Sequence, residues 1–287
     1  QQGANCGPVS DGCGGLTANC GTCTAPDICG GAGAPSVCGS IRPDAGGCTN
    51  LCLNQTACPG VDGGTTITGV VYAPTQADAG YGQPDPIPGA LIYIPNGVVG
   101  SLNGDGGVTC DQCADGVSGS PLVSTYSETN GSFRLTDVPC GAGVQVPVVI
   151  QLGKWRRQIT VPAPACCANT ALTQEQTRLP RKQGEQHPND NLPKIAVVTG
   201  SVDTIECVLP KIGIAADQYS LPSGNGRVKF YRDNGAQFPG TAPSAATLYD
   251  SLAEMRKYDM IILDCVASEQ TKSMTRRANL EAFANAG

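Results

Sequence analysis

Residues 129–141 read TNGSFRLTDVPCG, and this stretch decides the class of the first large domain. The pair Asn130-Gly131 is typical of a tight hairpin turn, because both residues tolerate positive φ angles. In the strand that follows, Phe133 and Leu135 are two positions apart and therefore point to one face of a sheet. Pro139 lacks a backbone N–H, which predicts the end of the strand. The stretch indicates one turn and one strand of an antiparallel β-domain.

The same pattern extends over residues 65–161, where short β-branched runs alternate with clusters of turn residues. This spacing predicts a small antiparallel sandwich. The candidate strands are TTITGVVYAP (65–74), GALIYIP (89–95), SFRLTDV (132–138) and VQVPVVIQL (144–152). We assign residues 61–167 to this all-β domain.

The region resembles the carboxypeptidase regulatory-like domain, a transthyretin-type β-sandwich. The residues that carry the resemblance are Ile67, Gly69, Val71, Pro88-Gly89-Ala90, Thr129-Asn130-Gly131, Phe133, Leu135, Val138, Pro139 and Gly141. The chain departs from the family pattern by a Gly- and Cys-rich insertion over residues 96–121 and by Cys140, where the family usually has a small residue. The resemblance implies an accessory domain without catalytic residues of its own.

Cysteine usage predicts an oxidising compartment. The chain has 16 cysteines, and nine of them lie in the first 60 residues, where apolar residues are scarce. Disulfides replace a hydrophobic core in small modules outside the cytosol. Residues 1–60 are therefore predicted to be a disulfide-rich Gly/Cys module, and the protein to be extracellular or at the cell surface. Cys6 to Cys38 resembles Cys-rich repeats near the N-termini of secreted or lipid-anchored bacterial surface proteins.

The sequence does not choose among the pairings of this module, but the cysteine counts constrain them. Nine cysteines precede residue 61 and five lie between residues 61 and 167. Two odd numbers require at least one disulfide that crosses between the regions if all of these cysteines pair. We expect Cys140 to be tethered to Cys166 or Cys167.

Residues 168–193 are polar and rich in Gln and Pro, which predicts a linker. After it come three short apolar runs, KIAVVTG (194–200), RVKFY (227–231) and DMIILDC (259–265), of the kind buried in a parallel sheet. Helical patterns lie between and after them. We expect a capping box of Asp203 and Glu206, one helical face with Leu248, Leu252 and Met255, and another with Met274, Ala278 and Phe283.

Residues 194–287 are thus predicted to be a partial α/β three-layer, flavodoxin-like domain. They resemble the opening half of a class I glutamine amidotransferase-like domain, through the strand at 195–199, Tyr258-Asp259, the strand at 260–264 and the helix ending LEAFANAG. In that family the nucleophilic Cys lies on a later segment, so we expect the native polypeptide to continue past Gly287 or to be cleaved there. The resemblance transfers no catalytic residue to this chain.

Two cysteines in this domain have alternative readings. Cys265 follows a predicted parallel strand, a position where α/β folds place reactive groups. Cys207 should lie at the same edge of the sheet if the third strand flanks the first. A Cys207–Cys265 disulfide is the preferred reading and a reactive thiol at Cys265 the alternative.

The insertion carries oxygen ligands that make it a weak calcium candidate: Asn103, Asp105, Asp111 and Asp115. Their spacing differs from that of a standard calcium loop, which favours solvated turn residues. The Cys110 and Cys113 pair lies in the same loop, and a structural disulfide is favoured over a redox or zinc site. No other cofactor is predicted.

Lys154, Trp155, Arg156 and Arg157 form a basic-aromatic cluster in an acidic region, and Trp155 is the only Trp. An exposed Trp155 with Arg156 and Arg157 would contact a sugar or a partner protein. The favoured alternative is a core Trp flanked by solvated charges on a strand.

Composition excludes several function classes. A net charge of −6 disfavours nucleic acid, and a single His disfavours a His-rich metal centre or a His-based triad. No run reaches the roughly 20 apolar residues of a membrane span, and no signal segment precedes Gln1, so we expect any export signal to have been removed.

The sequence favours a secreted or cell-surface structural or interaction protein, for example a subunit of an extracellular assembly or filament that self-associates or binds other surface proteins. The first alternative is the N-terminal part of an exported amidotransferase-like hydrolase. The second is a carbohydrate-binding surface protein.

Overall fold

The computed structural model describes residues 22–24, 27–29, 38–40, 48–61, 64–77, 80–102, 118–236, 240–267 and 272–286. The chain divides into two compact units. The first comprises Gln1–Ala73, Asp85–Ser101 and Gln112–Leu179, and the second comprises Pro74–Pro84, Leu102–Asp111 and Pro180–Gly287. Each unit is described by itself.

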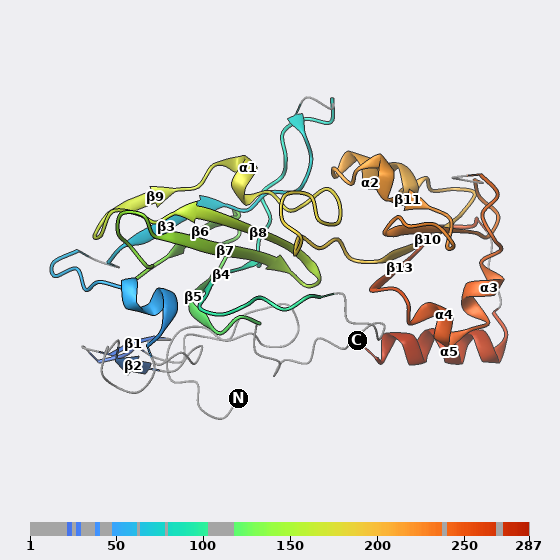
Figure 1. Cartoon of the computed structure of the whole chain (residues 1–287). Coiled ribbons are helices and arrows are strands. Elements are labelled where there is room, and N and C mark those ends of the chain that lie inside the picture. Colours follow the sequence, from blue (N-terminus) through green and yellow to red (C-terminus); the bar gives the residue numbers. More distant parts are fainter. Residues whose placement is uncertain are drawn as a thin grey trace. The chain divides into compact units, whose positions relative to one another are not determined.

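The first unit contains two sheets that account for its predicted β-rich character (Figure 1). In one, β3 (Thr66–Val70) lies between β6 (Ser132–Leu135), to which it is antiparallel, and β9 (Asn169–Ala171), to which it is parallel. The other is antiparallel, in the order β5-β4-β7-β8. Its strands are β5 (Pro121–Tyr126), β4 (Leu91–Pro95), β7 (Gln145–Leu152) and β8 (Trp155–Pro162).

Both sheets contribute to one hydrophobic core. Ile67 on β3 is in the same buried cluster as Ile92 on β4 and Ile150 on β7. Phe133 and Leu135 are 5% and 1% exposed, so the prediction that they share an inward face is confirmed. Burying large aliphatic and aromatic side chains of this kind contributes about 1.5–3 kcal/mol each. The alternation of inward residues on β6 and β7 therefore explains why these segments form strands.

The Asn130-Gly131 turn differs from the prediction. It is tight, since the Gly131 N–H donates to the Glu128 carbonyl at 2.8 Å and the Ser132 N–H donates to Asn130 Oδ1 at 3.0 Å. However, β5 and β6 belong to different sheets, so the turn does not form a hairpin. Gly131 has φ +76°, and a Cβ there would lie 2.9 Å from the Val71 carbonyl oxygen. The turn packs against Val71, the residue that follows β3, and this contact places β6 beside β3 rather than beside β5. The local sequence pattern does not encode it.

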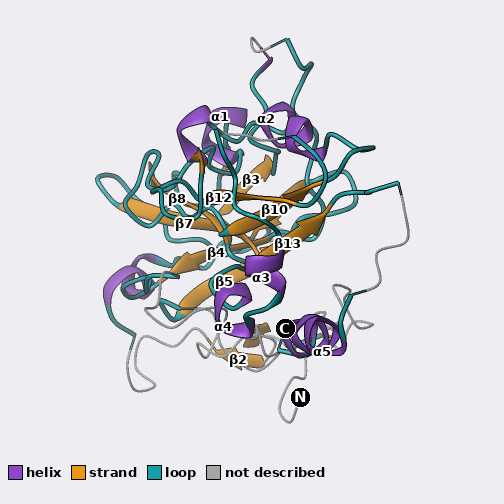
Figure 2. Cartoon of the chain, turned by 90° about the vertical axis from the view of Figure 1, so that its right-hand side faces the viewer, coloured by secondary structure: helices purple, strands orange, loops and turns teal. Residues whose placement is uncertain are grey.

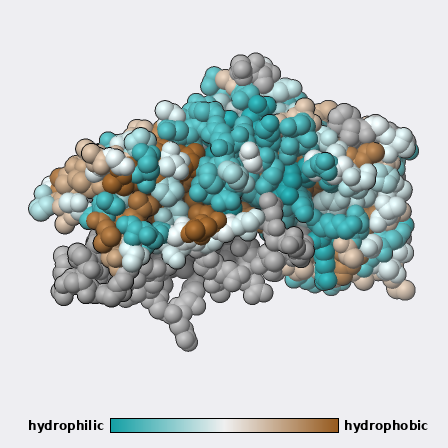
Figure 3. All heavy atoms as spheres, in the orientation of Figure 1, coloured by the Kyte–Doolittle hydropathy of each residue, from teal (hydrophilic) through white to brown (hydrophobic). Residues whose placement is uncertain are grey.

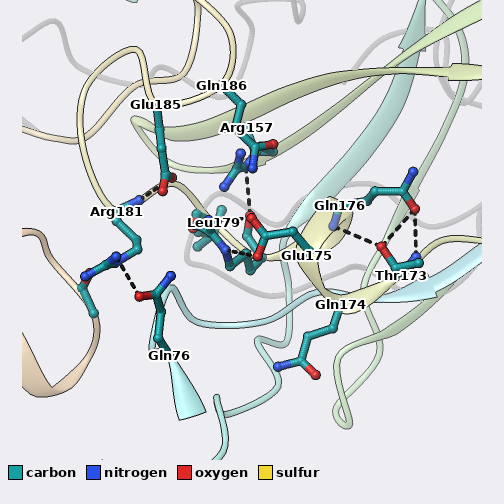
Figure 4. Close-up of polar contacts among 12 residues, drawn as sticks. Gln76, Arg157, Thr173, Gln174, Glu175, Gln176, Leu179, Arg181, Glu185 and Gln186 are labelled. Carbon is teal, nitrogen blue, oxygen red and sulfur yellow. Dashed lines mark hydrogen bonds and ion pairs between the residues drawn. The ribbon is translucent and has the colours of Figure 1, made fainter. Parts of the chain in front are cut away.

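Residues 168–193 were predicted to be a linker, whereas the structure orders their first part within the first unit. β9 pairs with β3, and Leu172 and Leu179 belong to the hydrophobic core. Between them α1 (Gln174–Thr177) begins at a capping box formed by Thr173 and Gln176 (Figure 4). The polar composition reflects an exposed helical turn, while two leucines at its ends supply the buried contacts.

Four disulfides lie among the described residues. Cys23–Cys38 joins the segment before β1 (Asp27–Cys29) to β2 (Cys38–Ser40), and Cys48–Cys52 spans the start of η1 (Asn50–Asn54). Cys58–Cys167 crosses from the N-terminal segment to the β-domain, which confirms the predicted crossing bridge. Cys140–Cys166 confirms the predicted tether and selects Cys166 over Cys167. The disulfide predicted for Cys110 and Cys113 lies outside the described residues, as do Cys6, Cys13 and Cys20.

The second unit contains a parallel sheet in the order β11-β12-β10-β13. Its strands are β11 (Tyr219–Ser220), β12 (Val228–Arg232), β10 (Ile195–Thr199) and β13 (Met260–Leu263). All five residues of β10 are buried, as expected for the central strand of a parallel sheet. The three predicted parallel strands are confirmed, and the third lies beside the first, as expected.

Short helices flank this sheet. α2 (Val208–Lys211) follows η3 (Ile205–Cys207) on one face, whereas α3 (Ala246–Tyr249), α4 (Leu252–Met255) and α5 (Met274–Ala284) lie on the other (Figures 1 and 2). Another short helix, η4 (Ala216–Gln218), precedes β11. Leu248 and Met255 are fully buried, as predicted, but they lie on the two separate helices α3 and α4 rather than on one helical face, and Leu252 is only half-buried.

Two helix predictions are wrong. In the face predicted for α5, Phe283 packs against the core as expected, but Met274 is 87% exposed and Ala278 is exposed as well, and Leu280 makes the second contact with the core. The capping box of Asp203 and Glu206 does not form either. The N-cap of η3 is Thr204, which makes no side-chain cap hydrogen bond.

The long-range disulfide Cys58–Cys167 should contribute more stability than the local Cys48–Cys52, because its sequence separation is 109 residues against 4. In the chain-entropy description, replacing Cys58 and Cys167 together with Ala costs about 5 kcal/mol, and replacing Cys48 and Cys52 costs about 2 kcal/mol. Urea titrations of the two double variants measure both values. Equal losses would show that loop closure does not set the contribution of these bridges.

Candidate functional site

The carboxyl ends of β10 and β13 form the candidate site of the second unit. The strands are adjacent and parallel, with Val198 opposite Leu263. β11 and β12, which follow β10 in the chain, lie on the other side of β10, so the direction of strand progression reverses between β10 and β13. In open parallel sheets, ligands bind at such a reversal, beyond the carboxyl ends of the strands.

Two glycines bring the loops at this edge into contact. A Cβ on Gly200 would lie 2.2 Å from the Cys265 carbonyl oxygen, and a Cβ on Gly235 would lie 2.3 Å from the Gly200 carbonyl oxygen. The Asn234 side-chain amide then donates to the Val266 carbonyl at 2.9 Å. The loop after β12 therefore crosses the end of β10 and reaches the loop after β13, which only residues without a side chain permit.

Asp264 is the buried acid of this edge. It is 8% exposed, and its Oδ2 accepts from the Gly200 N–H at 3.4 Å, while its Oδ1 is buried without a hydrogen-bond partner. The pKa of Asp264 is raised to about 6, first by burial and then by the neighbouring Glu206 and Asp203 carboxyl groups, while the hydrogen bond from the Gly200 N–H acts to lower it. An acid that titrates near neutral pH suits proton transfer or binding that depends on pH.

Glu206 faces the same position from η3. Its Oε2 is also buried without a hydrogen-bond partner, although the residue is only half-buried. One proton shared between the Glu206 and Asp264 carboxyl groups would replace like-charge repulsion by a hydrogen bond. We refer to these two residues as the acid pair.

The predicted Cys207–Cys265 disulfide is absent: both cysteines are free and exposed. The two residues do follow neighbouring strands, but η3 turns Glu206 toward Asp264 and leaves Cys207 on the exposed side. The geometry of η3, rather than the order of the strands, therefore explains why Cys207 and Cys265 do not form a disulfide. The alternative reading, a reactive thiol at Cys265, therefore stays a prediction.

The basic-aromatic cluster is placed differently from either sequence reading. Trp155 begins β8 and packs, half-buried, against the core of the first unit. Arg156 and Arg157 are 1% and 0% exposed, so the prediction that they are solvated, or available to a sugar or partner, is wrong. The Arg157 Nε–H donates to the Arg178 carbonyl at 2.9 Å, and Arg178 in turn pairs with Glu175. The bond to the Arg178 carbonyl therefore holds Arg157 inside the fold.

The calcium candidates Asn103, Asp105, Asp111 and Asp115 lie outside the described residues. Within the described part of the chain, no group of three or more His, Cys, Asp and Glu side chains is arranged to hold a metal ion. Across the same residues, no helix has the length and apolar character needed to cross a bilayer.

The sequence pattern does not identify the acid pair. In the sequence, Asp264 lies at the end of an apolar run, and Glu206 fits the predicted capping box. An Asp that directly follows a buried strand was the available signal. Sequence spacing could not identify Glu206 as the partner of Asp264, because 58 positions separate the two residues.

No family model matches the chain, and no curated protein matches it. Among solved structures, the chain is similar to one in a type II cohesin-X-dockerin complex from Acetivibrio cellulolyticus. The identity is 14%, the TM-score is 0.26, and the match covers 57% of this chain and 88% of that chain.

Asp264→Asn should stabilise the protein at neutral pH but not in acid. The pKa of Asp264 is about 6 in the folded chain against an ordinary value of 3.8. The folded state therefore binds the extra proton, and its benefit is complete below about pH 4 and lost as the pH rises to about 6. Relative to wild type, the variant should gain about 1–2 kcal/mol at pH 7.5 after allowance for solvent screening.

Urea titrations at pH 4 and pH 7.5 measure this difference, with Glu281→Gln, at an exposed position on α5, as the matched control. A gain of equal size at both pH values would contradict the assignment of the raised pKa to Asp264.

Proposed function

We propose that this chain is a secreted or cell-surface protein with a structural and protein-interaction role, such as a subunit of an extracellular assembly or filament. The observation that carries the proposal is the pair of bridges Cys58–Cys167 and Cys140–Cys166. The two bridges join Cys58 of the N-terminal segment and Cys140, which follows β6, to the adjacent residues Cys167 and Cys166. Bridges of this kind persist in oxidising compartments outside the cytosol.

In this proposal the β-domain is a rigid transthyretin-type sandwich of the carboxypeptidase regulatory-like family, and the parallel sheet is a flavodoxin-like, amidotransferase-like domain. Support for the first comes from two sheets sharing one core, and for the second from a parallel sheet with its first strand between the second and third. Most of the face seen in Figure 3 is hydrophilic, with apolar residues in small separate patches. Such a surface suits a secreted spacer with limited contact regions.

One contact region is suggested by exposed apolar residues at the end of the first unit. Leu53 on η1 is 65% exposed and Val98, in the loop after β4, is 92% exposed. Asn96 ties these segments together, since its carbonyl accepts from the Asn50 side-chain amide at 3.1 Å and its Oδ1 accepts from the Cys52 N–H at 3.4 Å. Two exposed apolar side chains on rigidly linked segments suit protein contact through self-association.

Sedimentation velocity of the oxidised full chain tests this role. Replacing Leu53 and Val98 with Ser should weaken self-association about tenfold, because apolar area is then no longer removed from water at the contact. The matched control is Met274→Ser, at a residue 87% exposed on the second unit. A chain that stays monomeric at all concentrations, or a control variant with the same effect, would contradict the proposal.

The second candidate function is an exported amidotransferase-like hydrolase that uses Cys265 itself as the nucleophile, in place of a cysteine on the later segment that the family resemblance implies. The acid pair beside the free, exposed Cys265 favours it. A hydrolase would release ammonia from glutamine or another carboxamide, and Asp264→Asn would abolish that release while preserving self-association. If the chain self-associates but hydrolyses no amide, the result contradicts the hydrolase and supports the interaction role.

A further inference from the structure

The segment that follows β10, residues 201–208, is weakly anchored. Val202 and Val208 are 55% and 46% exposed, and most of the residues between them are exposed or half-buried. The segment's two helical pieces, η3 and the start of α2, have N-caps at Thr204 and Cys207 that make no side-chain hydrogen bond. Uncapped turns with few buried contacts open at low free-energy cost.

The segment is held more firmly beyond its C-terminal end than at its start. Leu209 is 5% exposed, and the Lys211 carbonyl accepts from Thr75 Oγ1 at 3.2 Å. At the start, the Val202 N–H donates to the Cys265 carbonyl at 3.2 Å. The inward contact in the middle is made by Glu206 toward Asp264. The acid pair therefore decides whether the middle of the segment stays against the sheet.

The charges around Asp264 make this contact sensitive to protons. Asp264 is flanked by Glu206 on η3, by Asp203 in the loop after β10 and by the Gly200 N–H at the end of β10, with the thiols of Cys207 and Cys265 following Glu206 and Asp264 in the chain. The charges acting on its pKa are those of Glu206 and Asp203, and both are negative. With one proton in the acid pair the two carboxyl groups attract each other, and with none they repel.

We propose that residues 201–208 form a pH-controlled latch over the carboxyl ends of β10 and β13, closed while the acid pair shares a proton and released when both carboxyl groups are ionised. Release uncovers Gly200 and Asp264 at the strand reversal, the position where parallel sheets bind ligands. The latch is independent of the interaction role proposed above, because it involves only the second unit.

Hydrogen–deuterium exchange of the oxidised full chain tests the latch. After correction for the intrinsic exchange rate, amides of residues 202–208 should lose about tenfold of their protection between pH 5 and pH 8, while those of β12 keep theirs. In Glu206→Gln and in Asp264→Asn the segment should stay protected at pH 8, because the amide donates to the remaining carboxylate. The matched control, Glu281→Gln on α5, should behave as wild type.

Two results would overturn the proposal. One is wild-type protection of residues 202–208 that is the same at pH 5 and pH 8. The other is a loss of protection on raising the pH that persists in both acid-pair variants. If one variant fails to fold, the other still decides between these outcomes, since each removes one of the two ionisable groups.

Discussion

The first unit depends on the turn that contains Cys166 and Cys167, because two disulfides meet there. Cys167 bonds to Cys58, which precedes β3, and Cys166 bonds to Cys140, which follows β6. Backbone contacts reinforce the junction: the Cys167 N–H donates to Thr65 Oγ1 at 2.8 Å, and the Cys140 N–H donates to the Asn54 carbonyl at 2.9 Å. Cys167 itself has φ +63°, a conformation that the surrounding bonds hold in place. With this junction closed, the ends of β3 and β6 and the start of β9 have little freedom to separate.

The second unit is stabilised in a different way. Its described residues include two cysteines, both free, and its stability comes from the buried central strand β10 and from helices packed on the sheet. Tyr231 and Tyr258 add a buried hydroxyl pair at 2.8 Å, and the Tyr231 hydroxyl also donates to Glu254 at 3.0 Å. Against this satisfied network, the acid pair leaves two buried oxygens without partners. Buried oxygens without hydrogen-bond partners destabilise a fold locally, and proteins keep such groups chiefly at binding and catalytic sites.

The two units thus combine a rigid, disulfide-bonded β-domain with an α/β-domain whose functional edge is adjustable. The proposed extracellular scaffold needs the rigid β-domain, since its contact residues must keep their spacing outside the cell. A site that responds to pH needs the adjustable α/β-domain, since two short uncapped helical pieces move at low cost. Arg156 and Arg157 show how rigid the first unit is, because both are charged yet fully buried in it. The Arg157 Nε–H donates to the Arg178 carbonyl, and Arg156 also has an interaction partner.

Much of the architecture was already determined by the sequence alone. Two-residue alternation identified the strands around Phe133 and Ile150, and continuous apolar runs identified β10, β12 and β13, because strand periodicity and burial are local properties. Odd cysteine counts required the crossing bridge. Only the tertiary structure decided that the Asn130-Gly131 turn connects two sheets, that residues 169–179 complete the first unit, that Arg156 and Arg157 are buried, and that Glu206 rather than Cys207 faces Asp264. Each of these depends on contacts between segments far apart in the chain, and such contacts leave no local pattern.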